Sequence, residues 1–285
     1  FRGLCMGKLC RSIELMREGR RRGYAVPAYD TFNYESTKMV FDAAEKAGTP
    51  VIIMYYNDGY IPMDTFAVMV KSLGARSSVP FSLHLDHSPD FETCMRAIQS
   101  GFTSIMIDAS KRPFDENVRE TRRVVETAHA LGIDVEGELG IVGREEKVDR
   151  DRFTQPGEAR RFAEETGVDS LAVAIGNSHG VYIEEPRLDI ELLKRIAAEA
   201  EPLLVLHGTS LIPVDQLKEA VRQGITKTNI ATEYLMYYKE QVARVLAGDK
   251  PPKVIAALLQ AAYGPVVDFI AEKMRALNPD GLSIL

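Results

Sequence analysis

The sequence lacks the features that mark several classes of protein. Its 285 residues contain no tryptophan and only three cysteines, Cys5, Cys10 and Cys94. The cysteine count is odd and no Cys-x-x-Cys pair occurs, which argues against a disulfide framework or a cysteine zinc site and favours a reducing, cytoplasmic compartment. No apolar run approaches the roughly 18 residues of a membrane span, so none is predicted. The first residues, Phe1–Leu4, lack the layout of a signal peptide.

An excess of basic residues is also missing. The 35 Lys and Arg residues face 41 Asp and Glu residues, which gives a net charge of −6 at pH 7. This balance argues against broad nucleic-acid binding, which requires a basic surface. It does not exclude an anionic small substrate, because a few local donors suffice to hold a phosphate.

Short apolar runs rich in β-branched residues recur along the chain and predict eight strands. They begin 22 to 37 residues apart. Their continuous apolar character is typical of parallel strands that are buried on both faces. The predicted strands are Tyr24–Tyr29, Val51–Tyr56, Phe81–Leu85, Ser104–Asp108, Asp134–Leu139, Leu171–Ile175, Leu203–Leu206 and Ile225–Ile230.

Helical patterns separate these strands, and eight alternating units predict a closed barrel. An additional helix is expected before the first strand, because Leu9, Ile13 and Met16 follow helical spacing. The segment Val254–Leu277 predicts a helical extension at the C-terminal end. We find no linker, so the fold class predicted for residues 1–285 is α/β, a single-domain (β/α)8 TIM barrel. The predicted helices are Glu35–Ala47, Met63–Leu73, Phe91–Gln99, Glu116–Leu131, Gly157–Thr166, Asp189–Ala200, Val214–Gln223 and Glu233–Leu246.

Three of the five histidines, His87, His179 and His207, stand at the ends of three different predicted strands. In TIM barrels the C-terminal ends of the strands share one rim, which carries the active site. Each imidazole alone is more simply explained as a hydrogen-bonded loop histidine. Three that converge and leave a fourth position open are typical of catalytic zinc. His84 lies one layer deeper on its strand, which predicts a packing or supporting role.

The same rim carries residues that suit a phosphate. Gly180 and Gly208 allow close approach of a ligand to the backbone. Ser210, Asn229 and Thr232 add side-chain donors. The segment around Ile230 and Ala231 leads into a helix, whose N-terminal amides are expected to face the mouth of the barrel. Loops after the seventh and eighth strands often bind phosphate in TIM barrels.

The sequence resembles the zinc-dependent class II ketose-bisphosphate aldolases, and most closely their tagatose-bisphosphate branch. The resemblance runs from about Leu9 to Ile230 and, more loosely, to the end of the chain. Six ordered motifs at strand ends carry it. They are LHLDHS (83–88), GFTSIMIDAS (101–110), VEGELGIVGREE (135–146), TGVDSLAVAIGNSHGVY (166–182), LVLHGTS (204–210) and KTNIATE (227–233).

The resemblance implies a reversible cleavage of a ketose (bis)phosphate to dihydroxyacetone phosphate and an aldehyde. By position, it implies Zn²⁺ on His87, His179 and His207, and a second or displaced cation, divalent or monovalent, on Asp108 and Glu138. It implies that Asp86 is the catalytic acid/base and that Glu146 acts from a mobile loop. It also implies a homodimer or homotetramer whose interface contains the C-terminal helices. The residues implied to bind dihydroxyacetone phosphate are Gly180, Gly208, Thr209, Ser210, Asn229, Ile230, Ala231 and Thr232.

Departures from the family pattern lie on the aldehyde half of the expected pocket. Asp30 stands where the family commonly has asparagine, and we expect its charge to repel a dianionic distal group. Arg144 stands in a usually glycine-rich loop, and Tyr56 where smaller residues are usual. Lys253 is the nearest counterpart of the arginine that reaches the distal phosphate. The sugar therefore stays open between a tagatose- or fructose-bisphosphate-like substrate and a ketose 1-phosphate.

Two other functions are open alternatives. A catalytically weak or silent barrel that serves as a partner subunit would be consistent with the altered loop from Gly143 to Lys147. A metal-dependent hydrolase barrel would require a His-x-His pair on the first strand, and the run from Tyr24 to Tyr29 contains no histidine. No nucleic-acid or membrane partner is expected.

Overall fold

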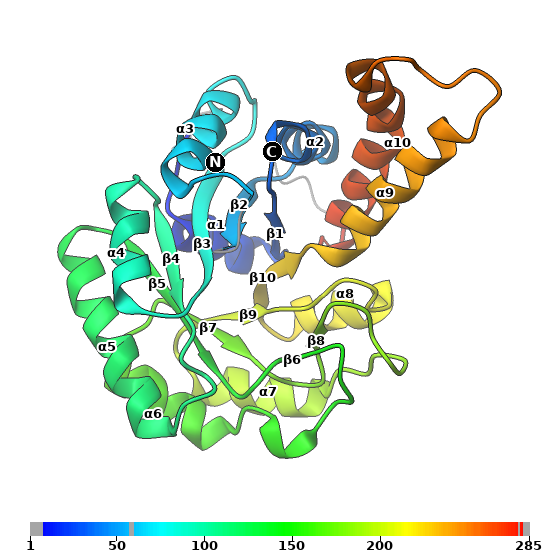
Figure 1. Ribbon diagram of the computed structural model, residues 1–285. Coiled ribbons are helices and arrows are strands. Elements are labelled where there is room, and N and C mark those ends of the chain that lie inside the picture. Colours follow the sequence, from blue (N-terminus) through cyan, green and yellow to red (C-terminus); the bar gives the residue numbers. More distant parts are fainter. Residues whose placement is uncertain (1–7, 57–59, 279, 282–285) are drawn as a thin grey trace.

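The computed structural model describes residues 8–56, 60–278 and 280–281; Cys5 and the segment Phe1–Leu4 lie outside these ranges. Eight parallel strands form a closed barrel in the order β1-β10-β9-β7-β5-β4-β3-β2, which confirms the predicted TIM-barrel fold (Figure 1). These strands are β1 (Val26–Asp30), β2 (Val51–Tyr56), β3 (Phe81–Ser88), β4 (Ser104–Ile107), β5 (Asp134–Leu139), β7 (Ser170–Val173), β9 (Leu203–Leu206) and β10 (Ile225–Ile230).

Helices surround the barrel, and their amphipathic faces pack against the strands. The core between strands and helices contains fully buried Val, Ile, Leu and Phe side chains, such as Ile53, Phe66 and Phe162. The helices are α2 (Tyr34–Ala47), α3 (Met63–Gly74), α4 (Phe91–Gln99), α5 (Phe114–Ala130), α6 (Pro156–Thr166), α7 (Ile190–Glu199), α8 (Val214–Arg222) and α9 (Thr232–Leu246).

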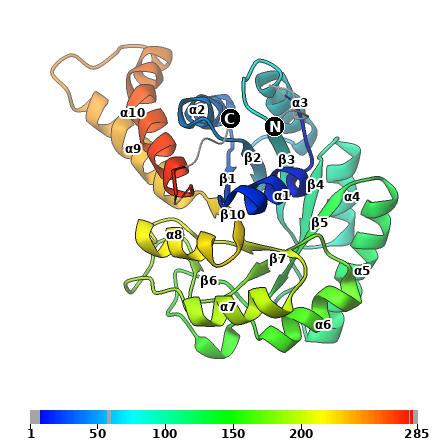
Figure 2. The same cartoon turned by 180° about the vertical axis from the view of Figure 1, so that it is seen from behind.

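The predicted additional helix, α1 (Ser12–Arg22), lies across the N-terminal end of the barrel (Figure 2). It begins later than the spacing suggested, because Leu9 instead forms a β-bridge with Phe81. Its buried residues Ile13 and Met16 pack with the apolar side chains that line the lower barrel. This helix therefore closes the end of the barrel that lies opposite the predicted active site.

Two features were not predicted. Residues Gly143–Arg144 (β6) and Ser178–His179 (β8) form a small parallel sheet that joins the loops after β5 and β7. The helices α9 and α10 (Ile255–Ala276) form a hairpin, named here the C-terminal arm, whose tip projects away from the barrel (Figure 1).

Helix α10 is long and apolar enough to cross a membrane by length and composition, with a mean hydropathy of 1.3 over its most apolar window. The core helix of a globular protein can pass the same test. In this structure α10 packs against α2 and α9, and its residues Val266 and Ile270 are buried. The predicted absence of a membrane partner stays a prediction.

Candidate active site

A backbone irregularity at the end of β3 brings two neighbouring side chains to the mouth of the barrel. The register between β3 and β4 shifts between Leu85 and Ser88. His87 adopts a φ of 47°, in the left-handed region that residues other than glycine rarely occupy. Asp86 and His87 therefore both line the same cavity, although strict alternation would send one of them to the other face.

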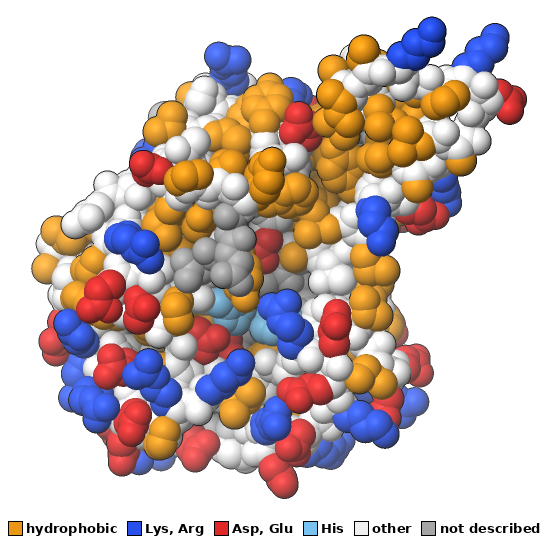
Figure 3. All heavy atoms as spheres, in the orientation of Figure 1, with side chains coloured by type: hydrophobic (Ala, Val, Ile, Leu, Met, Phe, Trp, Pro, Cys, Tyr) orange, Lys and Arg blue, Asp and Glu red, His pale blue; other side chains and the backbone are white. Residues whose placement is uncertain are grey.

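The three predicted histidines converge at the C-terminal mouth of the barrel. Nε2 of His87 lies 3.2 Å from Nε2 of His179 and 2.9 Å from Nδ1 of His207. The rings come from β3, from β8 and from the residue directly after β9. In the space-filling view, histidine side chains are visible at the bottom of the hollow in the middle of the barrel (Figure 3).

Carboxylates determine the charge of this cluster. Nδ1 of His87 lies 2.8 Å from Asp108 and 3.9 Å from Glu138. Burial disfavours the charged His87 ring, but the surrounding Asp86, Asp108 and Glu138 carboxylates outweigh it and raise the pKa of His87 to about 10. Burial lowers the pKa of both His179 and His207, and the charge on His87 lowers each further. Without a bound cation, these shifts favour a positive charge on His87 and neutral rings at His179 and His207.

The donor set fits a zinc ion. Nε2 of His87 lies 2.9 Å and 3.2 Å from the other two nitrogens, close to the spacing of about 3.3 Å that a tetrahedral zinc requires, and all three nitrogens lie within 4.8 Å of one another. A second group, made of His87, Asp108 and Glu138, also places its ligand atoms close together. Burial, together with the charge on Asp108, raises the pKa of Glu138 to about 8, and its Oε2 has no hydrogen-bond partner among the described residues. His87, His179 and His207 match the three-histidine ligand set of catalytic zinc, so they fit zinc better than the group of one histidine and two carboxylates.

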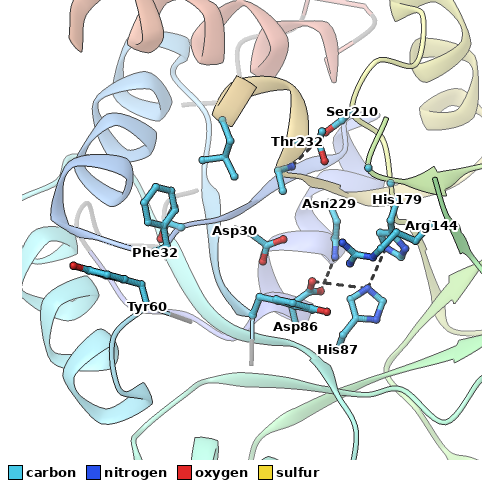
Figure 4. A pocket seen from close by; sticks show the side chains of 16 residues that line it. Asp30, Phe32, Tyr60, Asp86, His87, Arg144, His179, Ser210, Asn229 and Thr232 are labelled. Carbon is cyan, nitrogen blue, oxygen red and sulfur yellow. Dashed lines mark hydrogen bonds and ion pairs between the residues drawn. The ribbon is translucent and has the colours of Figure 1, made fainter. Parts of the chain in front are cut away.

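A cavity of about 470 Å³ lies beside the histidines and contains most of the residues predicted to bind substrate. Ser210 and Thr232 stand at one end, where α9 begins, and Phe32 and Tyr60 stand at the other (Figure 4). The N-terminus of α9 therefore faces the cavity, as expected for a phosphate site. The other lining residues that were predicted are Asp30, Asp86, His87, His179, Gly180, Gly208, Asn229 and Ala231.

Gly208 cannot be replaced by a larger residue without distorting this end of the cavity. Its φ is 58°, and a Cβ atom there would lie 2.3 Å from the backbone oxygen of Ser178. The loop after β9 is fixed further by Leu211, whose amide donates to Glu233 at 2.8 Å. The loop after β9 and the segment that contains Ser178 thus meet with no space for a side chain, and both border the substrate cavity.

Three residues predicted to bind substrate do not line this cavity. Thr209 is buried with its hydroxyl donating to the backbone oxygen of Asn229 at 2.8 Å, and the Ile230 side chain belongs to the core. These two support the cavity from behind. Lys253 is exposed between α9 and α10, and it does not line the cavity because the C-terminal arm projects away from the barrel. The predicted contact of Lys253 with substrate is therefore not formed within one chain.

Glu146 also lies outside this cavity. It borders an adjacent hollow of about 620 Å³ that contains Asp108 and Glu138. Its carboxylate accepts a hydrogen bond from Arg152 at 2.8 Å. Its neighbour Glu145 packs its side chain against Gly180, which does line the substrate cavity. Glu146 therefore faces the adjacent hollow, whereas Glu145 lies against the wall of the substrate cavity.

Sequence reasoning missed Glu136, which contacts a predicted ligand. This buried carboxylate lies 2.8 Å from Nε2 of His207. Glu136 stands two residues before Glu138 on β5 and shares its strand face, so the alternation that places Glu138 inside the barrel would have found it.

A closed (β/α)8 barrel with a three-histidine cluster and a phosphate-suited cavity at its C-terminal mouth is typical of metal-dependent enzymes that act on phosphorylated substrates. The family described as fructose-bisphosphate aldolase class-II matches residues 11–281. The chain therefore belongs to the class II fructose-bisphosphate aldolase family and is an aldolase, a lyase.

Individual relatives agree with this assignment. A fructose-bisphosphate aldolase of Geobacillus stearothermophilus is 38% identical over 283 residues, which cover 94% of this chain and 96% of that protein. The fructose-bisphosphate aldolase of Thermus caldophilus is 39% identical over 275 residues, covering 86% and 89%. Among solved structures, the YdjI aldolase from Escherichia coli K12 matches with a TM-score of 0.87 and 35% identity, over 96% of this chain and 99% of that one. The closer likeness to the tagatose branch stays a prediction.

Proposed function

We propose that this chain is a zinc-dependent aldolase that reversibly cleaves a ketose phosphate to dihydroxyacetone phosphate and an aldehyde. The observation that carries the proposal is the convergence of His87, His179 and His207 beside a cavity whose far end suits a phosphate. His87 and His179 would hold zinc through Nε2, and His207 through Nδ1. Bound there, the ion would supply Lewis-acid stabilisation of the negative charge that develops on the substrate oxygens during cleavage.

The residues around this site divide the remaining work. Asp86 is the base that takes the proton of the C4 hydroxyl in the cleavage direction, and Asn229 fixes its carboxylate by donating a hydrogen bond at 2.8 Å. The loops that contain Gly180, Gly208 and Ser210, together with the N-terminus of α9, hold the phosphate of dihydroxyacetone phosphate. Asp108 and Glu138 provide a second cation position next to His87.

Metal analysis and chelation test the zinc proposal. We expect about one Zn²⁺ per chain and loss of aldolase activity with a strong chelator, because three imidazoles form a site of high affinity once zinc displaces the proton of His87. His207→Ala should lose both zinc and activity, whereas His129→Ala should retain both, since His129 lies on the surface and pairs with Asp169. A zinc-free protein whose His207→Ala variant is fully active would contradict the proposal.

For the substrate, we propose a ketose phosphate whose distal end carries no phosphate. Arg144 is the one lysine or arginine among the described residues that line the cavity, and it lies on the His179 side, away from Phe32 and Tyr60 (Figure 4). The distal end is lined instead by Phe32 and Tyr60, whereas Tyr56 lies edge-on to His87 with Arg144 over its ring. Aromatic walls suit a neutral carbon chain better than a dianion.

The charge argument made for Asp30 from the sequence is weakened by the burial of its carboxyl. Burial and the neighbouring Asp86 raise the pKa of Asp30 well above its ordinary range, which favours the uncharged carboxyl and weakens its repulsion of an anion. The proposal therefore depends on the shortage of cationic side chains at the distal end.

Measurement of kcat/KM for fructose and tagatose 1,6-bisphosphates beside the corresponding ketose 1-phosphates tests the substrate. We expect the 1-phosphates to be preferred. A tenfold or greater preference for fructose 1,6-bisphosphate, about 1.4 kcal/mol of transition-state stabilisation, would contradict the distal assignment. If the zinc-loaded chain released dihydroxyacetone phosphate from none of these sugars, the silent-subunit alternative would be favoured.

We also propose a cytoplasmic homodimer or homotetramer formed from single-domain chains. The C-terminal arm supports this, because large apolar side chains such as Val254 and Ile255 are exposed on it. Apolar surface also covers much of the arm in the space-filling view (Figure 3).

A further inference from the structure

A chain of hydrogen bonds crosses the interior of the barrel directly below the histidine cluster. Its residues come from five different strands or strand ends: His207 after β9, Glu136 on β5, Lys227 on β10, His84 on β3 and Ser104 on β4. All five are buried. The successive contacts measure 2.8 Å (His207 Nε2–Glu136 Oε1), 2.8 Å (Glu136 Oε2–Lys227 Nζ), 3.4 Å (Lys227 Nζ–His84 Nε2) and 2.7 Å (His84 Nδ1–Ser104 Oγ).

The charge on Lys227 determines which group donates and which accepts along this series of hydrogen bonds. An ammonium group can only donate, so Glu136 Oε2 and His84 Nε2 both accept from it. The proton of the neutral His84 ring therefore lies on Nδ1 and is donated to Ser104. On the other side, Glu136 is an acceptor with its second oxygen facing His207, so His207 carries its proton on Nε2.

The other nitrogen of His207 is then the one that faces the proposed metal. Its Nδ1 has a lone pair and points to Nε2 of His87 at 2.9 Å. His87 and His179 present the opposite ring nitrogen, Nε2, to the same point. One of the three rings is thus turned around relative to the others, and its contact with Glu136 accounts for the difference.

Simple packing does not explain Lys227. Its side chain is fully buried, and a buried ammonium group without a partner would be strongly destabilising. Its partner Glu136 is equally inaccessible, with 1% of its side chain exposed. A pair of apolar residues could fill this volume at no cost in desolvation. The buried pair is therefore explained by the second oxygen of Glu136, Oε1, which accepts a hydrogen bond from His207 and holds its ring.

We propose that Lys227 and Glu136 are positioning residues that fix the tautomer and ring orientation of His207, so that Nδ1 is presented as a metal ligand. Lys227 does not line the substrate cavity; it acts through Glu136. This inference rests on the proposed zinc site but is tested independently of catalysis.

The first test uses nitrogen-15 NMR of the full chain labelled at histidine, without metal and after addition of Zn²⁺. We expect the His207 ring to carry its proton on Nε2 in both states, and zinc to bind His207 through Nδ1 but His87 and His179 through Nε2. Comparison with a His207→Gln spectrum assigns the signal. A His207 ring protonated on Nδ1, or bound to zinc through Nε2, would overturn the proposal even if the enzyme were an active aldolase.

The second test is the double variant E136L/K227M, which removes both charges together, leaves no buried ion without its partner and leaves no oxygen at position 136 to accept from His207. Thermal unfolding of the metal-free protein shows whether it folds. We expect its zinc affinity, measured by chelator competition, to fall by roughly 10- to 100-fold, the range for loss of a group that orients a metal ligand. The absorption spectrum of bound Co²⁺ should also change.

Thr226→Val is the matched control. Thr226 is a buried neighbour of Lys227 on β10 whose hydroxyl donates to the backbone oxygen of Leu204, away from the chain of five residues. It should keep the parental zinc affinity and cobalt spectrum. A double variant that binds zinc as tightly as the parent, with an unchanged cobalt spectrum, would overturn the proposal. Failure of the parent chain to bind zinc would instead contradict the proposed function, while the tautomer test on the metal-free protein would still apply.

Discussion

At the scale of single residues, the Asp86 carboxylate is the group most directly placed for proton transfer. It lines the substrate cavity and accepts a hydrogen bond from Asn229, which comes from a different strand. We expect Asp86→Asn to keep its zinc and to cleave substrate roughly 10²-fold or more slowly, the scale for loss of a positioned acid/base group. Metal analysis and steady-state release of dihydroxyacetone phosphate measure the two effects. Near-parental cleavage by the zinc-loaded variant would exclude Asp86 as the base.

The two loop glutamates make a second prediction at this scale. Glu146, which the resemblance places on a mobile loop, is the candidate for C3 proton transfer, and its carboxylate is paired with Arg152 in this structure. Glu145 instead packs against Gly180 at the substrate cavity. If the loop rearranges on substrate binding, Glu146→Gln should slow exchange of the C3 proton of dihydroxyacetone phosphate and Glu145→Gln should not. Hydrogen exchange followed by NMR distinguishes them. The opposite result would transfer the role to Glu145.

At the scale of elements, helix α1 depends on a buried carboxyl at the base of the barrel. Asp134, at the start of β5, accepts a hydrogen bond from the Ile13 amide at 3.2 Å. Burial, with a contribution from the charge of Asp169, raises the pKa of Asp134 to about 7. In the unfolded chain it is about 3.9. The folded state therefore binds the proton more tightly, so this contribution to stability is full below about pH 4 and is lost as the pH rises through about 7.

We therefore expect Asp134→Asn to stabilise the protein at alkaline pH. The amide oxygen can still accept from Ile13, and no charge is left to bury. The melting temperature of the variant should exceed that of the parent by roughly 2–8 °C at pH 8, and the difference should nearly vanish at pH 4.5. Calorimetry of the metal-free proteins at the two pH values measures this. A difference independent of pH would show that Asp134 does not titrate in this range.

At the scale of the whole molecule, the C-terminal arm leaves apolar side chains in solvent. Val254 and Ile255 are 62% and 68% exposed, near the tip of the hairpin between α9 and α10. If the arm forms the interface between copies, Ile255→Glu should convert a dimer or tetramer to smaller species. Analytical ultracentrifugation measures the change. Leu131→Glu, a change at a similarly exposed residue after α5, is the control that should not alter the assembly. A monomeric parent chain would contradict the predicted oligomer.

Local pattern was enough to predict the eight barrel strands nearly as they are found. The buried parallel strands are continuous apolar runs, and turns and helical periodicity separate them, so each is recognisable from its own residues. Both ends of β2, β5, β9 and β10 agree with the prediction. The sites on the rim could be predicted for the same reason, because a closed parallel barrel brings all strand ends to one mouth.

The sequence by itself therefore determined the barrel, and it pointed to three histidines and a phosphate-suited cavity at one rim. Only the tertiary structure decided which side chains touch one another. Contacts between strands depend on register, which is why the pairing of Glu136 with His207 and Lys227 was not foreseen. Loop and arm geometry depends on packing between distant segments, which separated Glu146 and Lys253 from the cavity. Periodicity is a property of neighbouring residues, whereas these contacts join residues tens of positions apart.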